Sequence, residues 1–344
     1  MNVLVLSTMV PFVHGGAEEL AANLVINLQR HGVAAEAMAL PFSWDPAERL
    51  IEEMLIARSL RLYNVDRVIA LKFPAYLVEH PDRTVWLLHQ YRQAYDLRDA
   101  GQSNIEHSPR GDTLQRAIRT ADSLALGSAR QLFTNSATTA ARLLRYNGLH
   151  GVVLPPPLND PELFQPAVSD GYILAGGRVN AGKRQHLLVE AAARAPGVRL
   201  VVAGPPDTPA DAERLRTLVA RHGLADRVHL DLRFLPRDEL GRLVSAAQAV
   251  AYLPFDEDSP GYVTMEACHA GKPIITVNDA GGVLALAIDG ETGWVCSPDI
   301  EALAAALAEA SSNDTAAKAR GKAAQMRFAD LKLTWPDTIE RLLA

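Results

Sequence analysis

The order of apolar and polar positions in the first half of the chain indicates strands that alternate with helices. Short apolar runs bounded by turn signals are typical of strands in a sheet covered on both faces. Leu20, Leu24 and Leu28 recur every four residues, which predicts a helix that ends near Gly32. A second amphipathic helix is predicted near Glu48–Leu60. The strands predicted in this half are Val3–Ser7, Ala35–Leu40, Arg67–Leu71 and Thr84–Leu88.

This pattern breaks at the prolines Pro155, Pro156 and Pro157, and Pro161 and Pro166 follow. A proline run cannot continue a helix or a central strand, so we interpret this stretch as a linker between two domains. Beyond the linker the alternation starts again. Helices are predicted at Arg184–Ala193 and Asp314–Arg327, and strands at Tyr172–Ala175, Arg199–Ala203, Val228–Leu232, Ala249–Leu253 and Pro273–Val277.

Alternation on both sides of the linker predicts the α/β fold class, with two doubly wound parallel sheets in Rossmann-like domains. We assign residues 1–158 to the first domain and residues 159–329 to the second. The end of the chain, about 330–344, is predicted to form a short helix that crosses back to the first domain. Each domain carries a glycine pair after its first strand, at Gly15–Gly16 and at Gly176–Gly177.

Composition and charge exclude several classes of protein. A chain of 344 residues with 48% apolar residues is long enough for two full cores. The net charge is −6 and neither half is basic, which argues against a nucleic-acid partner. The two cysteines, Cys268 and Cys296, make neither a disulfide framework nor a metal-ligand pattern. Each cysteine is most simply a small buried residue.

The beginning of the chain and its apolar runs bear on localisation. Met1 and Asn2 lead straight into a strand, without the basic segment and cleavage site of a signal peptide. No apolar run approaches the roughly 20 residues needed to span a bilayer. We expect a cytoplasmic protein, and peripheral contact with the inner face of a membrane stays open.

A diphosphate site is suggested where the first strand of the second domain ends. Ligands of doubly wound sheets bind at the carboxyl ends of the strands. There, Gly176 and Gly177 bare the backbone, a helix follows, and Arg178 and Lys183 can neutralise two anionic oxygens. The alternative is a tight strand–helix turn with basic surface residues. The GxGxxG pattern of dinucleotide-binding proteins is absent from this turn.

The segment Asp256–Ile275 suits a ligand rich in hydroxyl groups. Asp258 and Glu266 stand eight residues apart with Gly261 between them, and a short helix is predicted at about Val263–Ala270. Each carboxylate can accept two hydrogen bonds from a diol, and the helix amides can hold an anion. The alternative is a solvated acidic loop that leads into an ordinary strand–helix unit.

Four weaker candidates lie at other strand ends. His89 closes the strand before Gln90 and can donate to a sugar hydroxyl or to a backbone carbonyl. Lys72 also ends a strand and could reach the cleft, but it is more simply interpreted as a charged residue at a strand end. Gly281–Gly282 either leaves room for a diphosphate or forms a plain turn. Gly290 and Gly293 are expected to shape a turn without chemistry.

Taken in order, these segments resemble the family-4 glycosyltransferases of the GT-B fold. In the first half the resemblance depends on Gly15–Gly16 and on HQ at 89–90. In the second half it is stronger, and it covers GGR with Lys183, VVAG at 201–204, FLPRDEL at 234–240, EDSPGYVTMEACHAGKPIIT at 257–276, GG at 281–282 and DGETGW at 289–294.

The resemblance implies two domains that face a cleft and an enzyme that retains the anomeric configuration of the transferred sugar. It needs neither a metal nor a cofactor, and the donor is a UDP- or GDP-linked sugar. The expected acceptor is a hydroxyl of a glycan, a lipid-linked molecule or a small molecule, in bacterial glycan or polysaccharide assembly. Acceptor choice is expected in first-domain loops such as Asp96–Asp112, and the linker near 155–166 is expected to act as a hinge.

Site roles also follow from the resemblance, position by position. Arg178 and Lys183 would hold the diphosphate and stabilise the leaving group. Glu266 would bind the ribose hydroxyls, and His89 would contact the donor sugar. Asp258 would contact the hydroxyls of the donor sugar. The main chain near Phe234 and Leu235 would contact the base. The other predicted donor-binding residues are Gly15, Gly16, Gly177, Gly204, Gly261, Tyr262 and Val263.

Two positions depart from the family pattern. The first of its two glutamates is Asp258 here, one methylene shorter, and Glu257 stands just before it. Either residue can therefore take the first carboxylate role. Family members often carry a glutamate three residues after the second glycine of the GG pair, where this chain has Ala285. No side-chain contact is expected there.

Other functions on a similar architecture stay open from the sequence. A sugar-nucleotide epimerase would need further acid–base carboxylates near the sugar. A phosphorylase of this fold would be expected to carry a lysine for pyridoxal phosphate, and neither feature is evident. A two-lobed binding protein without catalysis is disfavoured by the cation pair Arg178 and Lys183.

Overall fold

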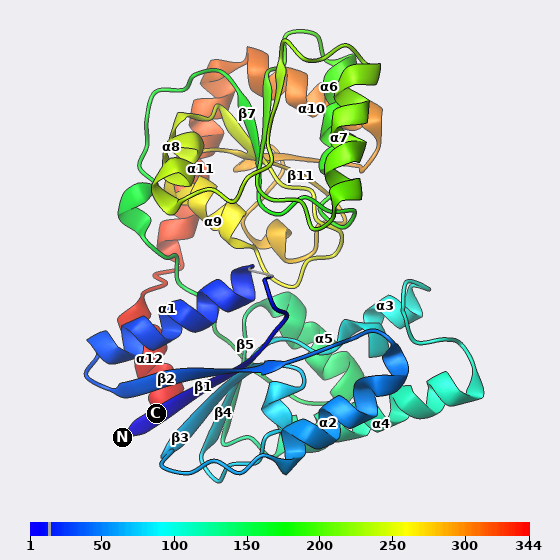
Figure 1. Ribbon diagram of the computed structural model, residues 1–344. Helices are drawn as coiled ribbons and strands as arrows, with labels where there is room; N and C mark the ends of the chain where they lie inside the picture. Colours follow the sequence, from blue (N-terminus) through cyan, green and yellow to red (C-terminus); the bar gives the residue numbers. More distant parts are fainter. Residues whose placement is uncertain (13–14) are drawn as a thin grey trace. The chain divides into compact units, whose positions relative to one another are not determined.

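The computed structural model describes residues 1–12 and 15–344, and the chain divides into two compact units. Unit 1 comprises Met1–Pro157 together with Leu333–Ala344, and unit 2 comprises Leu158–Lys332. Each unit is a parallel sheet flanked by helices (Figure 1). The α/β class with two doubly wound parallel sheets is therefore confirmed.

Unit 1 has a six-stranded parallel sheet in the order β2-β1-β3-β4-β5-β6. The order reverses between β1 and β3, which is the switch point of the flavodoxin-like type of doubly wound sheet. The carboxyl ends of these two strands are therefore where a ligand site is expected. The strands are β1 (Asn2–Met9), β2 (Ala34–Pro41), β3 (Arg67–Lys72), β4 (Arg83–His89), β5 (Gln131–Thr134) and β6 (Val152–Val153).

Two apolar clusters cover the two faces of this sheet. On one face α1 (Gly16–Arg30) buries Leu20, Leu24 and Leu28 together with residues of α12 (Trp335–Leu343). The other face is covered by α2 (Leu50–Ser59) and α4 (Pro109–Gly127). The remaining helical segments are α3 (Asp96–Asp99), α5 (Ala137–Asn147), η1 (Ala47–Arg49), η2 (Ala75–Leu77) and η3 (Arg92–Ala94).

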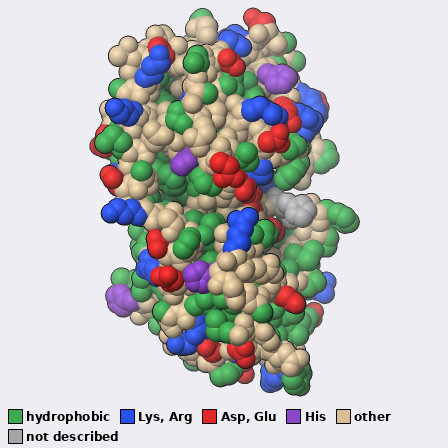
Figure 2. All heavy atoms as spheres, turned by 90° about the vertical axis from the view of Figure 1, so that its left-hand side faces the viewer, with side chains coloured by type: hydrophobic (Ala, Val, Ile, Leu, Met, Phe, Trp, Pro, Cys, Tyr) green, Lys and Arg blue, Asp and Glu red, His purple; other side chains and the backbone are tan. Residues whose placement is uncertain are grey.

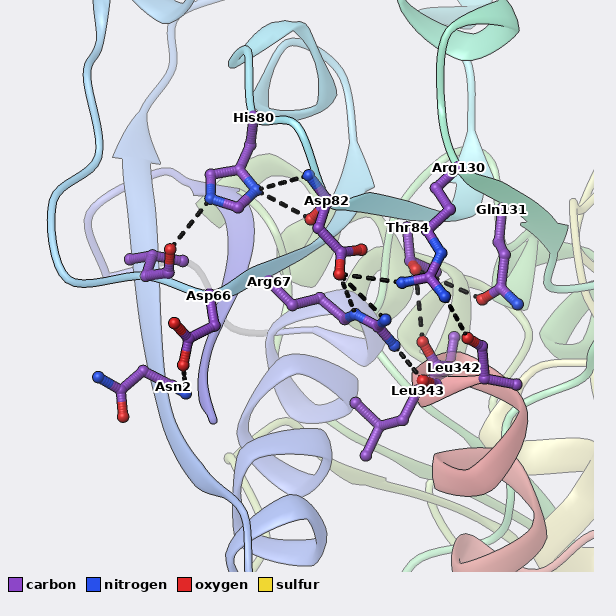
Figure 3. A network of polar contacts seen from close by, with 12 residues as sticks. Asn2, Asp66, Arg67, His80, Asp82, Thr84, Arg130, Gln131, Leu342 and Leu343 are labelled. Atoms are coloured by element: carbon purple, nitrogen blue, oxygen red, sulfur yellow. Dashed lines mark hydrogen bonds and ion pairs between the residues drawn. The ribbon is translucent and has the colours of Figure 1, made fainter.

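The carboxyl end of α12 is fastened to unit 1 by polar contacts that Figure 3 shows from close by. Arg67 donates to the carbonyl of Leu343, and Thr84 Oγ1 donates to the carbonyl of Leu342 at 3.3 Å. Asp82 accepts from both Arg67 and Arg130, each at 3.0 Å. The last carbonyls of a helix lack partners within it, and side-chain donors supply them here.

Unit 2 has a second six-stranded parallel sheet, in the order β12-β11-β10-β7-β8-β9. Counted along the chain this is the Rossmann order 3-2-1-4-5-6, with the switch point between β7 and β10. The strands are β7 (Ile173–Gly176), β8 (Leu200–Ala203), β9 (Val228–Asp231), β10 (Ala249–Ala251), β11 (Ile274–Val277) and β12 (Gly293–Cys296). The helical segments are α6 (Gln185–Arg194), α7 (Pro209–Arg221), α8 (Arg237–Ala246), α9 (Tyr262–His269), α10 (Ile300–Ser312), α11 (Asp314–Asp330), η4 (Pro161–Leu163) and η5 (Gly282–Ala285).

Several elements were not predicted from the sequence. The short strands β5, β6 and β12 are not among the predicted strands; β6 is exposed, whereas β5 and β12 are partly buried. Gly293 begins β12, where a Cβ would lie 1.9 Å from the carbonyl oxygen of Ile274. The expectation that Gly290 and Gly293 only shape a turn is therefore wrong for Gly293, because the close approach of β11 requires it. Gly290 does lie in a turn, with φ of 73°.

The surface and the helices bear on the expected partners. Acidic and basic side chains are interspersed on the face of the molecule shown in Figure 2. Among the residues that the structure describes, no helix combines the length and the apolar character that crossing a membrane requires.

Candidate active site

The switch point of unit 2 brings together loops that are far apart in the sequence. The turn at Gly176–Gly177 follows β7, and the segment from Tyr252 to Asp258 follows β10, the neighbouring strand. Because both strands are parallel, these segments leave the same edge of the sheet. This edge is where a Rossmann-ordered sheet binds its ligand.

Lys183 is held at this edge by the start of α6. Its backbone N–H donates to Asn180 Oδ1 at 2.9 Å, and Arg184 follows in the left-handed conformation with φ of 55°. Its ammonium donates to the hydroxyl of Tyr252 at 2.8 Å and forms an ion pair with Glu257. Burial alone would lower the pKa of Lys183, but Tyr252 and Glu257 together raise it above its ordinary value. Lys183 is therefore a fixed, charged ammonium.

Arg178, the second predicted cation, is less enclosed. Its guanidinium lies 3.2 Å from Asp207, and its side chain is 39% exposed. Asn180 Nδ2 also donates to Asp207 at 2.9 Å, which ties the turn after β7 to the turn after β8. Both cations predicted to hold a diphosphate therefore have a carboxylate partner in the structure.

The glycines of this edge let neighbouring backbones approach closely. A Cβ on Gly204 would lie 2.2 Å from the carbonyl oxygen of Gly177, and φ of Gly204 is 142°. A Cβ on Gly177 would lie 3.3 Å from the side chain of Val263 at the start of α9. The bare turn after β7 thus packs on the turn after β8 and on the amino end of α9.

Glu266 lies on α9 and is only 2% exposed. Its Oε1 accepts from the guanidinium of Arg237 at 2.5 Å. Arg237 also lies 3.5 Å from Asp160, donates to the carbonyl of Asn159 at 3.1 Å and stacks over the ring of Phe164. Sequence reasoning missed Arg237 as a site residue, although it stands within the quoted segment FLPRDEL.

The acidic loop before α9 is tightly packed. Asp258 is 8% exposed. Gly261 has a φ of 75°, a backbone angle that residues with a side chain rarely adopt. Cβ atoms on Gly281 and Gly282 would lie 2.4 Å from the carbonyl oxygen of Glu257 and 2.7 Å from the backbone of Ser259. The glycine pair therefore lets this loop approach closely, and the expectation that the pair also leaves room for a diphosphate stays a prediction.

The remaining predicted donor residues of unit 2 differ in exposure. Phe234 presents an aromatic ring to solvent, with 71% of the residue exposed, whereas the next residue, Leu235, is buried. Tyr262 is the first residue of α9 and is partly buried. The contact of the base with the main chain near Phe234 and Leu235 stays a prediction.

In unit 1 the predicted residues gather at the ends of β1, β3 and β4. Lys72 pairs in register with His89 across β3 and β4, and its ammonium contacts Glu18 of α1 at 2.8 Å. His89 Nδ1 lies 2.8 Å from the carbonyl oxygen of Gln90. Since a carbonyl can only accept, Nδ1 carries the proton and is the donor. In the neutral form of the ring, this hydrogen bond leaves Nε2 as an acceptor.

The first glycine pair lies at the switch point of unit 1. Gly15 is the N-cap of α1 and Gly16 is its first residue, and a glycine at the N-cap has no side chain to offer to the first-turn amides. The backbone amides of the first turn therefore need other partners. The part of the predicted loop at residues 13–14 lies outside the described residues.

The segment predicted to choose the acceptor is structured. Asp96–Asp112 contains α3 and the first turn of α4. Between α2 and α4 it helps to line a cavity of about 380 Å³, with Ile51, Ile105 and Leu114 among the lining residues. A hollow with both apolar and polar walls therefore exists in the segment where the acceptor is expected.

Metal binding is not indicated by the arrangement of ligand-type side chains. Among residues 1–12 and 15–344, no group of three or more His, Cys, Asp or Glu side chains is placed to hold a metal ion. That the reaction needs no metal stays a prediction.

Comparison with known sequences places unit 2 in a family context. Residues 162–327 match the family described as Glycosyl transferases group 1. D-inositol 3-phosphate glycosyltransferase from Mycolicibacterium smegmatis is 33% identical over 174 residues, which cover 49% of this chain and 38% of the relative. Glycogen synthase from Mycobacterium tuberculosis is 34% identical over 48% of this chain and 39% of that protein. The chain thus spans about two fifths of the length of these curated relatives.

Comparison with solved structures covers the chain almost completely. HepE from Anabaena, solved with UDP and glucose, has a TM-score of 0.73 at 18% identity and covers 100% of this chain and 98% of its own. WaaG, a glycosyltransferase of lipopolysaccharide biosynthesis, has a TM-score of 0.73 at 17% identity, with 98% of each chain covered. At these identities the likeness establishes the fold, which is the GT-B type expected from the sequence.

Proposed function

Residues 162–327 match glycosyl transferases group 1, and on that premise we propose that this chain transfers a sugar from a nucleotide-diphosphate sugar to a hydroxyl acceptor. The proposed transfer retains the anomeric configuration and uses no metal ion. The expected donor is a UDP- or GDP-linked sugar.

The observation that carries this proposal is the group of side chains at the switch point of unit 2. An ammonium that stays charged, Lys183, stands at the start of α6, and a buried carboxylate, Glu266, stands on α9. A helix start beside a fixed cation suits a diphosphate, and a carboxylate suits the two hydroxyls of a ribose. HepE, which shares the fold, was solved with UDP and with UDP-glucose, and this supports a nucleotide-sugar donor here.

The charges suggest how the bond to the departing phosphate breaks. As it breaks, positive charge develops on the sugar and negative charge on the departing diphosphate. Lys183, with Arg178 beyond it, would stabilise the leaving group, because preorganised cations favour the state in which charge has developed. His89 is assigned to the donor sugar, with its Nε2 as the acceptor that the hydrogen bond from Nδ1 leaves available.

The acceptor's proton needs a destination in this scheme. Apart from His89 we assign no general base, so we propose that the leaving phosphate takes the proton on the same face of the sugar. For the acceptor itself, the cavity between α2 and α4 has the mixed apolar and polar lining that suits a hydroxyl-bearing molecule. We propose that this cavity contributes to acceptor binding.

A direct test measures turnover of UDP- and GDP-linked sugars with a panel of hydroxyl acceptors, after a thermal-shift screen against UDP, GDP and ADP. NMR of the product then reports the anomeric configuration. Retention is expected, and an inverted product would exclude the same-face mechanism. Incubation with donor alone separates the alternatives, because formation of a new sugar would indicate an epimerase. Binding without turnover would indicate a two-lobed binding protein.

A further inference from the structure

The ammonium of Lys183 already has an anionic partner within its own unit. Glu257 forms an ion pair with it, and the hydroxyl of Tyr252 lies beside the pair, 2.8 Å from Nζ and 3.4 Å from Glu257 Oε2. The side chains of Lys183 and Glu257 are 21% and 25% exposed, so this pair is largely shielded from water. Glu257 is thus an acid placed where the proposed function puts a phosphate oxygen.

The backbone of Glu257 is fixed in a way that aims its side chain at this position. Its N–H donates to the carbonyl of Ala280 at 3.2 Å, and its carbonyl accepts from the N–H of Gly282 at 2.8 Å. Gly281 forms a bridge with it, and a Cβ on Gly281 would lie 2.5 Å from the nitrogen of Glu257. These backbone contacts therefore hold the loop that carries the carboxylate against the turn that follows β11.

We propose that Glu257 competes with the diphosphate of the donor for the ammonium of Lys183, and so sets how tightly this site holds a nucleotide diphosphate. This inference rests on the proposed function. A diphosphate brings more charge and more acceptor oxygens than one carboxylate, so it can displace Glu257 from Lys183. When the nucleotide diphosphate leaves after transfer, the carboxylate returns to the ammonium and lowers the affinity for the product.

A different role for Glu257 predicts the opposite result. If the carboxylate served to hold Lys183 in position for the phosphate, its removal would weaken nucleotide binding. If it competes, its removal strengthens binding. The sign of the change in affinity therefore separates competition from positioning.

The test is calorimetric titration of the full chain with UDP and with GDP, for the wild type and for Glu257→Gln. The amide keeps the size of the side chain and removes its charge. We expect the variant to bind the preferred diphosphate about tenfold more tightly. Glu291→Gln is the matched control, since Glu291 is an exposed acid of the same unit. This variant should bind the nucleotide diphosphate with the affinity of the wild type.

A double variant links the effect to Lys183. In the Lys183→Gln background, Glu257→Gln should give no gain, because the ammonium for which both anions compete is gone. Circular dichroism of each variant checks that it is folded. If the wild type binds UDP or GDP and Glu257→Gln binds it equally or more weakly, this inference is overturned. The proposed function would stand in that case. If neither UDP nor GDP bound to any folded variant, the proposed function would fall and the inference with it.

Discussion

Arg237 and Glu266 form an ion pair across α8 and α9, with 2.5 Å between Nη1 and Oε1. Glu266 is almost fully buried, and a buried carboxylate stays charged only with such a partner. The pair therefore keeps an acceptor-only side chain at the place where the ribose hydroxyls are expected. It also means that one of the two carboxylate oxygens is already engaged.

Replacing Arg237 should leave Glu266 buried without its main cation. Arg237→Ala is expected to lower the free energy of unfolding by about 2 kcal/mol, less than for a fully buried pair, because the Arg237 side chain is 27% exposed. It should also weaken binding of the nucleotide. Urea denaturation and calorimetry measure the two effects. Arg242→Ala on the same helix is the control, since this arginine is 73% exposed and should change neither quantity. Wild-type stability in Arg237→Ala would mean that the pair contributes nothing.

Replacing Lys183 should affect the chemical step more than the fold. Lys183→Ala is expected to lose about 2–4 kcal/mol of transition-state stabilisation, which is a fall of roughly 30- to 1000-fold in kcat/KM. The measurement is the rate of sugar transfer at subsaturating donor. Lys318→Ala, on an exposed position of α11, should leave the rate unchanged. Near-normal rates in both Lys183→Ala and Arg178→Ala would end the diphosphate assignment.

Replacing Arg67, which anchors the end of α12, should lower the stability of the protein without changing the site in unit 2. Arg67 is 5% exposed and connects Asp82 to the carbonyl of Leu343. Arg67→Ala should lower the free energy of unfolding by about 2–3 kcal/mol, because it leaves a helix carbonyl and a carboxylate with fewer partners. Thermal unfolding measures this effect. Arg61→Ala, an exposed arginine of the same unit, should stay within about 0.5 kcal/mol of the wild type. Equal losses in both variants would contradict the role of the anchor.

A buried acid in unit 1, Asp122, should make the free energy of unfolding depend on pH. Asp122 is fully buried, and burial raises its pKa from 3.8 to about 7, while the hydrogen bond from Tyr95 acts in the opposite direction. Between pH 3.8 and about 7 the folded protein holds a proton that the unfolded chain has released. The free energy of unfolding should therefore fall as pH rises through this window.

Urea denaturation of the wild type and of Asp122→Asn at pH 5 and pH 7 tests this dependence. The asparagine does not titrate, so the difference between the two pH values should be smaller in the variant than in the wild type. Asp226→Asn, which removes an exposed acid, should keep the wild-type difference. Equal pH dependence in Asp122→Asn and wild type would show that Asp122 does not carry the effect.

Much of the fold could be predicted because strand and helix signals are local. The period-four leucines of α1 and the apolar run of β4 depend on neighbouring residues in the sequence, and both elements form where they were expected. The strands β5, β6 and β12 were missed because each has four residues or fewer and none of the three is fully buried. Such strands exist through pairing with the neighbouring strand, which no local pattern records.

The sequence by itself determined that strands alternate with helices, and therefore that the glycine turn after β7 and the acidic loop after β10 leave the same edge of a parallel sheet. It did not determine which charges meet there. Only the strand order, with β10 beside β7, brings Glu257 to Lys183, 74 residues away, and only the packing of α8 on α9 brings Arg237 to Glu266. The physical reason is range, because backbone preferences act over a few residues, whereas ion pairs form wherever the folded chain brings opposite charges within about 4 Å.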